Sequence, residues 1–202
     1  MLKLKKDKFV LGVTGQIGSG KSVVARMFRA KNTLLLDADK MAHKLIYFEG
    51  ALYKKIKKVF GIKILRANKQ IDRQKLARIV FAHPASLAKL NGMVHPKLLE
   101  EIVCQVNNSD KQIIILDAAL IVGTGLERII DKLIVVQAKK EQQILRAAKR
   151  LKLDRKEVCQ RLKFQIPGRE ISRGADFIID NRGTLSKTLD QVSAIRRKLW
   201  KN

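Results

Sequence analysis

The sequence predicts an α/β fold in which helices cover a mostly parallel β-sheet. Short runs rich in apolar and β-branched residues recur along the 202-residue chain, and segments with helical spacing separate them. The runs are almost continuously hydrophobic, which is typical of strands buried on both faces. A glycine-rich turn follows the first run and opens a helix, and this order of strand, turn and helix is that of a βαβ unit.

Five runs are expected to be strands. They cover Phe9 to Thr14, Thr33 to Leu36, Gln112 to Leu116, Lys132 to Val136 and Phe177 to Ile179. Between residues 40 and 109 no run is typical of a strand, and the helix-like segments are interrupted by Gly50, Gly61, Pro84 and Pro96. We expect this region to be a helical insertion at the carboxyl edge of the sheet, where a second substrate can bind. A basic helical stretch over 139–163 is expected to fold over the site as a lid.

The most specific motif is the phosphate-loop pattern GxxxxGK[ST], which lies between the first strand and a helix expected over 22–29. Its glycines allow backbone N–H groups to turn toward an anion, and the helix N-terminus adds partial positive charge. Lys21 can reach the β- and γ-phosphates of ATP, and the Ser22 hydroxyl can bind Mg²⁺. The residues expected to hold ATP are Gly15, Gln16, Ile17, Gly18, Ser19, Gly20, Lys21, Ser22 and Val23. The alternative is a glycine-rich turn without a ligand, and the order of strand, loop and helix argues against it.

Two carboxylates, Asp37 and Asp39, follow the second strand directly. If the strand continues, both side chains point the same way. Mg²⁺ binds one or two carboxylates beside phosphates, and an acceptor hydroxyl needs a positioned carboxylate to take its proton. One acid can therefore serve the metal and the other the hydroxyl. N-capping of a helix over 40–47 is the alternative for either residue.

Asp117 ends the third strand, where phosphate-loop proteins commonly carry a carboxylate that supports Mg²⁺ indirectly. It could equally cap the following turn. The three histidines lack metal-ligand spacing. His95 precedes Pro96 at the expected start of a helix, where it could stabilise a turn or contact a substrate.

The chain is strongly basic, with 43 Lys and Arg against 18 Asp and Glu and a formal charge of +25. The basic residues are spread along the chain, and around Lys54 they alternate with apolar residues at helical spacing, so they are typical of solvated helix faces. A positive field also attracts phosphorylated substrates. Nucleic-acid binding is the alternative, but an aromatic content of 5% and the lack of an RNA-binding aromatic motif argue against it.

The two cysteines, Cys104 and Cys159, form no CxxC unit and lie in apolar helical patterns, so we expect buried thiols in a reducing compartment. The apolar stretch over 9–13 is too short for a signal peptide, and no stretch has transmembrane length. These features favour a cytoplasmic protein.

Taken together and in order, these motifs resemble the dephospho-coenzyme A kinase family. The resemblance runs from Val10 to about Val192. Besides the loop with Gly12 to Thr14, it rests on Leu36 to Asp39 with His43, Val59 to Gly61, Ile71 to Arg73, Val80 and Phe81, Leu90 and Asn91, His95 and Pro96, Ile134 to Val136, Gln143 with Arg146 and Arg150, Arg161 with Gln165, and Ala175 to Asn181.

The resemblance implies a P-loop kinase fold with a five-stranded parallel core, a coenzyme-binding insertion and a lid. The single domain 1–202 then divides into a nucleotide-binding core (8–39, 110–138 and 174–202), the insertion (40–109) and the lid (139–173). The implied reaction is transfer from ATP, with Mg²⁺, to the ribose 3′-hydroxyl of dephospho-coenzyme A. The resemblance implies catalytic roles for Lys21, Arg146 and Asp39, with Asp39 as the base. It implies contacts with the acceptor or with Mg²⁺ for Asp37, Arg73 and His95. It also implies ATP contacts for Arg150 and for Asn181, which would lie near the adenine.

One segment departs from the family pattern. The family usually has Asp-x-Pro-Leu-Leu-aromatic-Glu after the third strand, whereas residues 117–123 read Asp-Ala-Ala-Leu-Ile-Val-Gly. The proline and the glutamate are absent, so a role of that glutamate in shaping the acceptor pocket does not carry over. Another small P-loop kinase, acting on a nucleotide, nucleoside or metabolite, is the alternative within enzymes.

Overall fold

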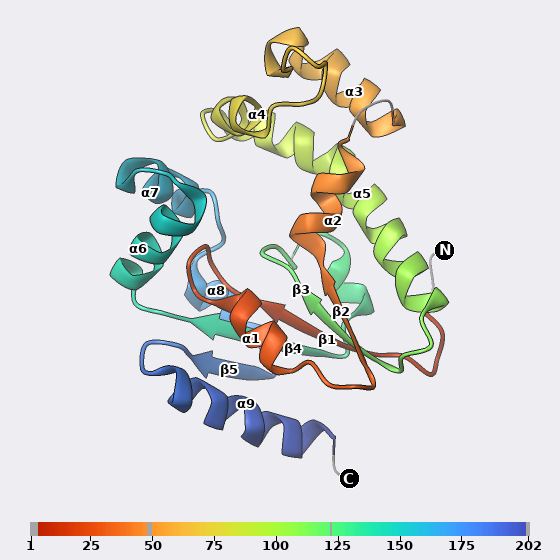
Figure 1. The fold of residues 1–202 in the computed structure, drawn as a ribbon, viewed down its shortest axis with the longest axis vertical. Helices are drawn as coiled ribbons and strands as arrows, with labels where there is room; N and C mark the ends of the chain where they lie inside the picture. Colours follow the sequence, from red (N-terminus) through yellow and green to blue (C-terminus); the bar gives the residue numbers. More distant parts are fainter. Residues whose placement is uncertain (1–3, 48–49, 122, 201–202) are drawn as a thin grey trace.

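The computed structural model describes residues 4–47, 50–121 and 123–200, and within them five parallel strands form one sheet in the order β2-β3-β1-β4-β5 (Figure 1). The strands are β1 (Phe9–Thr14), β2 (Thr33–Asp37), β3 (Ile113–Asp117), β4 (Lys132–Gln137) and β5 (Phe177–Asp180). Every neighbouring pair is parallel. The five expected strands are confirmed, and four of them extend one residue further at the carboxyl end than the apolar runs indicated.

Burial differs between the centre and the edges of the sheet. The central strands β1, β3 and β4 are buried almost throughout, as expected from their continuous hydrophobicity. The edge strands β2 and β5 are only partly buried, and the side chain of Ile178 in β5 is 49% exposed. The expectation of burial on both faces is therefore wrong for the edge strands, because a neighbour covers them on one side only.

Two hydrophobic clusters lie on opposite faces of the sheet, because successive strand residues point to opposite sides. The face that carries Leu11 packs against α1 (Lys21–Met27) and α9 (Leu185–Leu199). The face that carries Val10 packs against α5 (Pro84–Asn108) and the short helix α8 (Gly168–Arg173). The sheet is therefore held between helices, as the sequence predicted.

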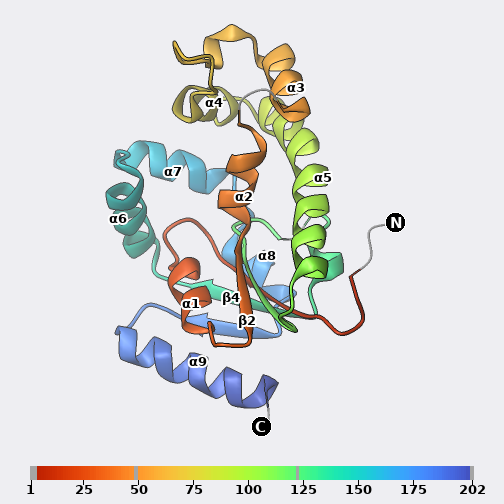
Figure 2. The same cartoon turned by 45° about the vertical axis from the view of Figure 1, so that its right-hand side comes forward.

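The insertion forms a separate helical arm above the carboxyl edge of the sheet (Figures 1 and 2). Its elements are α2 (Ala38–Leu45), α3 (Ala51–Phe60), the 3₁₀ turn η1 (Ile62–Ile64), α4 (Arg73–Val80) and the first half of α5. The arm has its own core, built around Ile56, Ile64 and Val80. Within its described residues, the only β-pairing is an isolated bridge between Leu65 and Ile71, so the expectation of a helical insertion is confirmed.

The long helix α5 corrects the expected position of His95 and Pro96. Both lie in the middle of this 25-residue helix, not at a helix start. A proline inside a helix costs about 3 kcal/mol. Burial of Val94, Leu98 and Ile102 along one face of α5 offsets that cost. Although α5 is long, neither it nor any other helix in the described part of the chain is long and apolar enough to cross a membrane.

The 139–173 segment follows β4 and contains α6 (Lys140–Leu151), α7 (Arg155–Lys163) and α8. Before β4 the chain forms a 3₁₀ turn, η2 (Leu126–Ile129). Helix α7 touches the insertion at Phe81, which ends α4. The Gln160 side chain donates to the Phe81 carbonyl at 2.9 Å, and the Arg161 guanidinium lies 5.2 Å from the Phe81 ring centroid. The Phe164 ring lies 6.0 Å from the same ring. We call this set of contacts the α7–Phe81 contact.

The expectation of two buried thiols is wrong. Cys104 is exposed and Cys159 is half-buried, although both are unpaired. Cys104 follows the buried pair Ile102 and Val103 on α5, and the rotation of about 100° per residue turns the next position outward. The apolar neighbourhood in the sequence therefore did not determine which side of the helix the thiol occupies.

Candidate active site

The loop between β1 and α1 has the backbone of an anion-binding loop. Gly18 and Gly20 have φ values of +76° and +97°, which side chains other than glycine rarely adopt. A Cβ atom on Gly18 would collide with the backbone of Gln143, and one on Gly20 would collide with the Asn181 amide. The expected order of strand, loop and helix is confirmed, but α1 covers Lys21–Met27 and not 22–29.

Side chains from two other parts of the chain hold this loop. The backbone N–H of Ile17 donates to Gln165 Oε1 at 2.8 Å, from the segment between α7 and α8. On the other side, Asn181 Nδ2 donates to the Ser19 carbonyl at 2.8 Å, and Asn181 Oδ1 accepts from Thr188 at 3.0 Å. The loop conformation is therefore fixed by contacts within the protein itself.

Lys21 and Asp39 face each other across the site. The Lys21 side chain is 5% exposed, and its Nζ lies 3.3 Å from Asp39 Oδ2. The Asp39 side chain is 48% exposed, so part of it is accessible from outside the site. The sequence predicted that the loop and the acids at the end of β2 would lie together, and in the structure Asp39 pairs with Lys21 of the loop.

The strand does not continue through both acids, so the condition under which their side chains would point the same way is not met. β2 ends at Asp37, and Asp39 lies in the first turn of α2. Asp37 caps this helix, because its Oδ1 accepts from the Lys40 N–H at 2.9 Å. The N-capping alternative thus holds for Asp37, and the cap presents Asp39 toward Lys21.

Asp117 lies beside Asp37, since the two residues are register partners in β2 and β3. It is 4% exposed, and its Oδ1 is buried without a hydrogen-bond partner. Burial raises the pKa of Asp117, while a hydrogen bond from Ser22 and the charge of Lys21 act in the opposite direction. A buried, unpartnered carboxylate oxygen next to Ser22 is suited to a cation.

A cavity of about 220 Å³ opens between α2, α5 and the segment after β3. Its polar lining includes Asp39, His43, Asn91, His95 and Thr124, and most of the remainder is apolar. Burial lowers the pKa values of both His43 and His95. The structure therefore joins Asp39 and His95 in one pocket, and it adds His43, which belongs to the family pattern but was given no role from the sequence.

Arg73 contacts His43, one of the residues that line the cavity. Its guanidinium lies 2.8 Å from His43 Nε2. Because a guanidinium only donates, Nε2 is the acceptor and the ring proton is on Nδ1. The two residues are 30 positions apart, and although the family pattern includes both of them, it does not indicate that they form a pair.

The two arginines expected to contact the phosphates lie one turn apart on α6. Both guanidinium terminal nitrogens of Arg146 lie 3.4 Å from the Asn181 carbonyl oxygen. Arg150 is exposed and has no hydrogen bond or ion pair within the described residues. Arg146, Asn181 and the phosphate loop are thus brought together, whereas no polar contact within the described residues links Arg150 to them.

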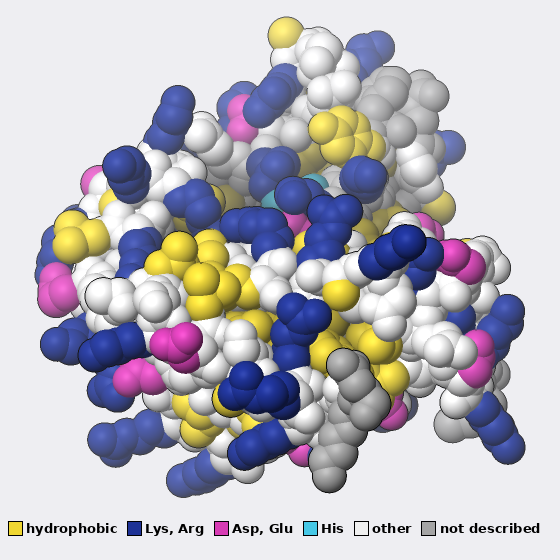
Figure 3. Space-filling model, turned by 60° about the horizontal axis from the view of Figure 1, so that its bottom comes forward, with side chains coloured by type: hydrophobic (Ala, Val, Ile, Leu, Met, Phe, Trp, Pro, Cys, Tyr) yellow, Lys and Arg dark blue, Asp and Glu magenta, His cyan; other side chains and the backbone are white. Residues whose placement is uncertain are grey.

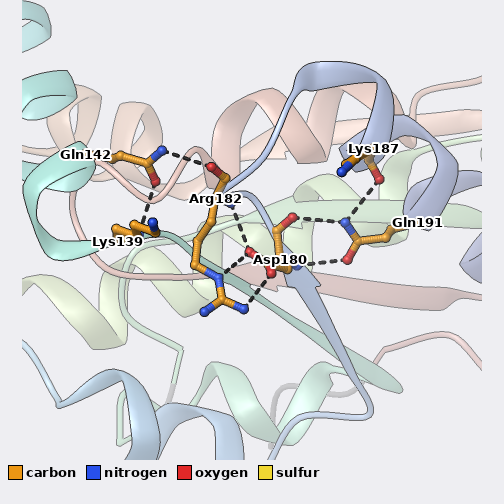
Figure 4. Close-up of polar contacts among 6 residues, drawn as sticks. All are labelled: Lys139, Gln142, Asp180, Arg182, Lys187 and Gln191. Carbon is orange, nitrogen blue, oxygen red and sulfur yellow. Dashed lines mark hydrogen bonds and ion pairs between the residues drawn. The ribbon is translucent and has the colours of Figure 1, made fainter.

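A polar network fixes the turn that carries Asn181 (Figure 4). The Asp180 carboxylate accepts from the Arg182 guanidinium at 2.6 and 2.8 Å. Gln191 on α9 accepts from the Asp180 N–H and donates to its carbonyl, both at 2.9 Å. Gln142 in the first turn of α6 donates to the Arg182 carbonyl at 2.9 Å, so the network connects α6, α9 and the end of β5.

Comparisons with known proteins identify relatives over almost the whole chain. The family model for dephospho-CoA kinase matches residues 9–187. The dephospho-CoA kinase of Aquifex aeolicus is 39% identical over 95% of this chain and 98% of its own length. That of Bacillus anthracis is 35% identical over 94% of this chain and 96% of its own length.

Solved structures show the same arrangement of elements. A protein from Thermus thermophilus has a TM-score of 0.79 and 28% identity, and the match covers 96% of this chain and 98% of that one. The dephospho-CoA kinase from Campylobacter jejuni has a TM-score of 0.66 and 28% identity over 95% and 97% of the two chains. Shikimate kinase from Acinetobacter baumannii, 14% identical with a TM-score of 0.51 over 95% and 93%, shares the fold.

Proposed function

The chain belongs to the dephospho-CoA kinase family, and from that premise we propose that it transfers the γ-phosphoryl group of ATP to the ribose 3′-hydroxyl of dephospho-coenzyme A. This is the last step of coenzyme A synthesis. The observation that carries the proposal is the Lys21–Asp39 pair, which lies where the phosphate loop meets the cavity. A coupled ADP-release assay with dephospho-coenzyme A, nucleoside monophosphates and adenosine tests it. Release with the nucleoside monophosphates alone would contradict it.

In this reaction the protein mainly positions the two substrates and neutralises charge. The loop N–H groups and Lys21 hold the phosphates of ATP. Asp39 borders the cavity and accepts the proton of the attacking hydroxyl. Arg146 and Arg150 reach the transferring group from α6, because guanidinium groups stabilise charge that is spread over phosphoryl oxygens.

The residues near the phosphate loop are suited to binding Mg²⁺. The unpartnered, buried Oδ1 of Asp117 and the adjacent Ser22 hydroxyl are oxygen donors of the kind that Mg²⁺ binds beside phosphates. Ser22 would bind the ion, Asp117 would support it indirectly, and Asp37 lies next to Asp117. When bound, Mg²⁺ neutralises charge on the phosphate oxygens.

Replacement of Asp117 by asparagine should stabilise the fold and weaken the response to Mg²⁺. At pH 7 the change replaces a buried, charged carboxylate with a neutral amide and so removes the cost of burying the charge. The free energy of unfolding should therefore rise by about 1 kcal/mol. The Mg²⁺ concentration for half-maximal rate should rise about tenfold, the size of effect expected for a group that acts through a metal ligand. Urea unfolding and Mg²⁺ titrations of the rate measure the two effects.

The stability gain of Asp117→Asn should depend on pH. Because burial raises the pKa of Asp117, the fold disfavours its charged form, and the gain is complete only above this raised pKa. The gain should disappear as the pH falls and the wild-type acid becomes neutral. Asp176→Asn is the control, because Asp176 accepts from Lys132 and Leu133 and its loss should destabilise the protein. A destabilised Asp117→Asn protein at pH 7 would contradict the account.

His43 should control the affinity for the acceptor through Arg73. His43→Leu removes the acceptor of the Arg73 hydrogen bond, so the KM for dephospho-coenzyme A should rise about tenfold, the value of one charge-assisted hydrogen bond. His43→Gln can still accept from Arg73 and should restore most of the affinity. Steady-state kinetics with saturating ATP separate KM from kcat. Equal KM values for the Leu variant and the wild type would exclude the role.

The wild-type KM should also depend on pH. Burial is the largest cause that lowers the pKa of His43, and the charge of Arg73 lowers it further. The charges of Asp39 and Asp37 act in the opposite direction. The neutral ring is therefore the folded form near pH 7. As the pH falls through this lowered pKa, the ring gains a proton and repels Arg73, so KM should rise in the wild type and stay constant in His43→Leu.

We also propose the division of the chain into the core (8–39, 110–138 and 174–202), the coenzyme-binding insertion (40–109) and the lid (139–173). The separate core of the insertion supports its boundaries, and the contacts of Arg146 and Gln165 near the phosphate loop support the lid. We propose a cytoplasmic location, because both thiols are unpaired, as is typical of a reducing compartment.

A nucleic acid is not the proposed partner. On the face shown in Figure 3, Lys and Arg side chains are distributed over the whole view and do not form one band. A nucleic-acid backbone is usually bound along a basic stripe or patch. The proposed substrates are small molecules, and salt-sensitive retention on DNA without phosphoryl transfer would contradict this.

A further inference from the structure

The insertion has a second recess that the proposed reaction does not use. It has a volume of about 470 Å³ and lies between the end of α3, η1, α4 and the start of α5. Its polar lining consists of Lys63, Arg78, His83, Ser86 and Lys89, above apolar residues such as Phe60. It shares no lining residue with the cavity that contains Asp39.

The charges around this recess are all of one sign. No Asp or Glu lines it, and Lys63, Arg78 and Lys89 have no ion pair or hydrogen bond within residues 4–47, 50–121 and 123–200. Other cations of the insertion do find partners, since Arg66 lies 3.7 Å from Asp72 and Lys75 donates to the Leu65 carbonyl at 3.0 Å. Three like charges around one recess repel one another, and an anion between them would remove that repulsion.

The start of α5 adds to the positive potential. The helix begins at Pro84, next to the recess, and its N-cap residue His83 makes no side-chain cap hydrogen bond. There is no acidic residue in the first turn, so the partial positive charge of the helix end is not neutralised by its own sequence. The Ser86 hydroxyl lies in the same turn and lines the recess, where it can donate to an anion.

We propose that this recess binds a small, multiply charged phosphorylated anion of the inorganic triphosphate or nucleoside polyphosphate class, at a site separate from the phosphate loop. Its volume is in the range of small-molecule sites, and its three cations lie around one recess. The ligand would border Ala82 and His83, which directly follow Phe81 of the α7–Phe81 contact. The inference is independent of the proposed function, because it uses none of the active-site residues.

The test is a titration of the isotope-labelled full chain with inorganic triphosphate, followed by backbone amide NMR shifts at constant ionic strength. Because shifts are assigned to residues, binding at 60–64 and 82–89 is measured separately from binding at 15–22. We expect both sets of amides to titrate. The triple variant Lys63→Gln, Arg78→Gln, Lys89→Gln should weaken binding at the recess by about tenfold or more and leave the titration at 15–22 unchanged.

The matched control is the triple variant Lys54→Gln, Lys55→Gln, Lys58→Gln, which removes the same charge from exposed positions of α3 outside the recess. It should change the affinity of the recess by less than about threefold, since these side chains do not line the recess and salt screens their charge over the longer distance. Equal weakening by both triple variants would overturn the proposal, and so would the absence of shifts at 60–64 and 82–89. Shifts there with an RNA oligonucleotide but not with triphosphate would also overturn it. The single variant Arg78→Gln repeats the test with a smaller change.

Discussion

Replacement of Lys21 by alanine is expected to lower kcat about a thousand-fold, because it removes a preorganised cation from the place where the transferring charge develops. The Lys21 side chain is almost fully buried, and the described structure places only Asp39 in an ion pair with it. A buried ammonium group keeps its orientation without reorganisation by water, so its electrostatic effect on phosphate oxygens is large. The ADP-release assay measures the loss.

Lys40→Ala is the matched control for this experiment. Lys40 lies next to Asp39 and pairs with Asp37 at 3.1 Å, but its side chain is 77% exposed. Its removal should change kcat by less than about threefold, because exposed ion pairs contribute little. A Lys21→Ala enzyme with near wild-type kcat, or a Lys40→Ala enzyme as impaired as Lys21→Ala, would remove Lys21 from its proposed role.

Replacement of Asp39 by asparagine should lower kcat by about a hundred- to ten-thousand-fold, the usual contribution of general acid–base catalysis. Asparagine has nearly the same shape, so the first turn of α2 and the adjacent cavity should keep their form. The change also removes the anion that pairs with Lys21, so ATP should bind as tightly as before or more tightly. Kinetics and an equilibrium titration with ATP measure the two effects.

Asp110→Asn is a suitable comparison, because it neutralises an exposed carboxylate before the amino end of β3, whereas the site lies at the carboxyl end of that strand, and it should leave kcat unchanged. If Asp39→Asn were fully active, Asp39 would not be the base. If ATP binding and kcat fell together, Asp39 would act in nucleotide binding and not in proton transfer.

The sheet was predictable because its strands are short and apolar and are separated by helices. The ends of the strands were predicted less well, since three of the four extra residues, Asp37, Asp117 and Asp180, are acids. Local propensity disfavours acids in strands, and register pairing with a neighbouring strand overrides it. Similarly, Pro96 is a local signal for a helix boundary, but the buried face of α5 continues the helix past it.

The site was predictable where its residues are close in sequence. The phosphate loop is a continuous pattern, and Asp39 follows a strand whose carboxyl end must lie at the same edge of the sheet. The hydrogen bond between His43 and Arg73 joins two helices through the fold of the insertion, and no spacing rule indicates it. The unpartnered oxygen of Asp117 was also out of reach, because it depends on what surrounds the side chain in three dimensions.

The α7–Phe81 contact has a consequence for how the two substrates influence each other. Arg146, proposed to contact ATP, and Gln160 belong to the same packed pair of helices, joined through Ile144, Ala147 and Val158. Phe81 belongs to the arm that carries Arg73 and the proposed acceptor contacts. A shift of either part upon substrate binding would reach the other through this contact, so we expect the binding of the two proposed substrates to be coupled. Thermodynamic linkage then requires that each substrate change the affinity for the other by the same factor.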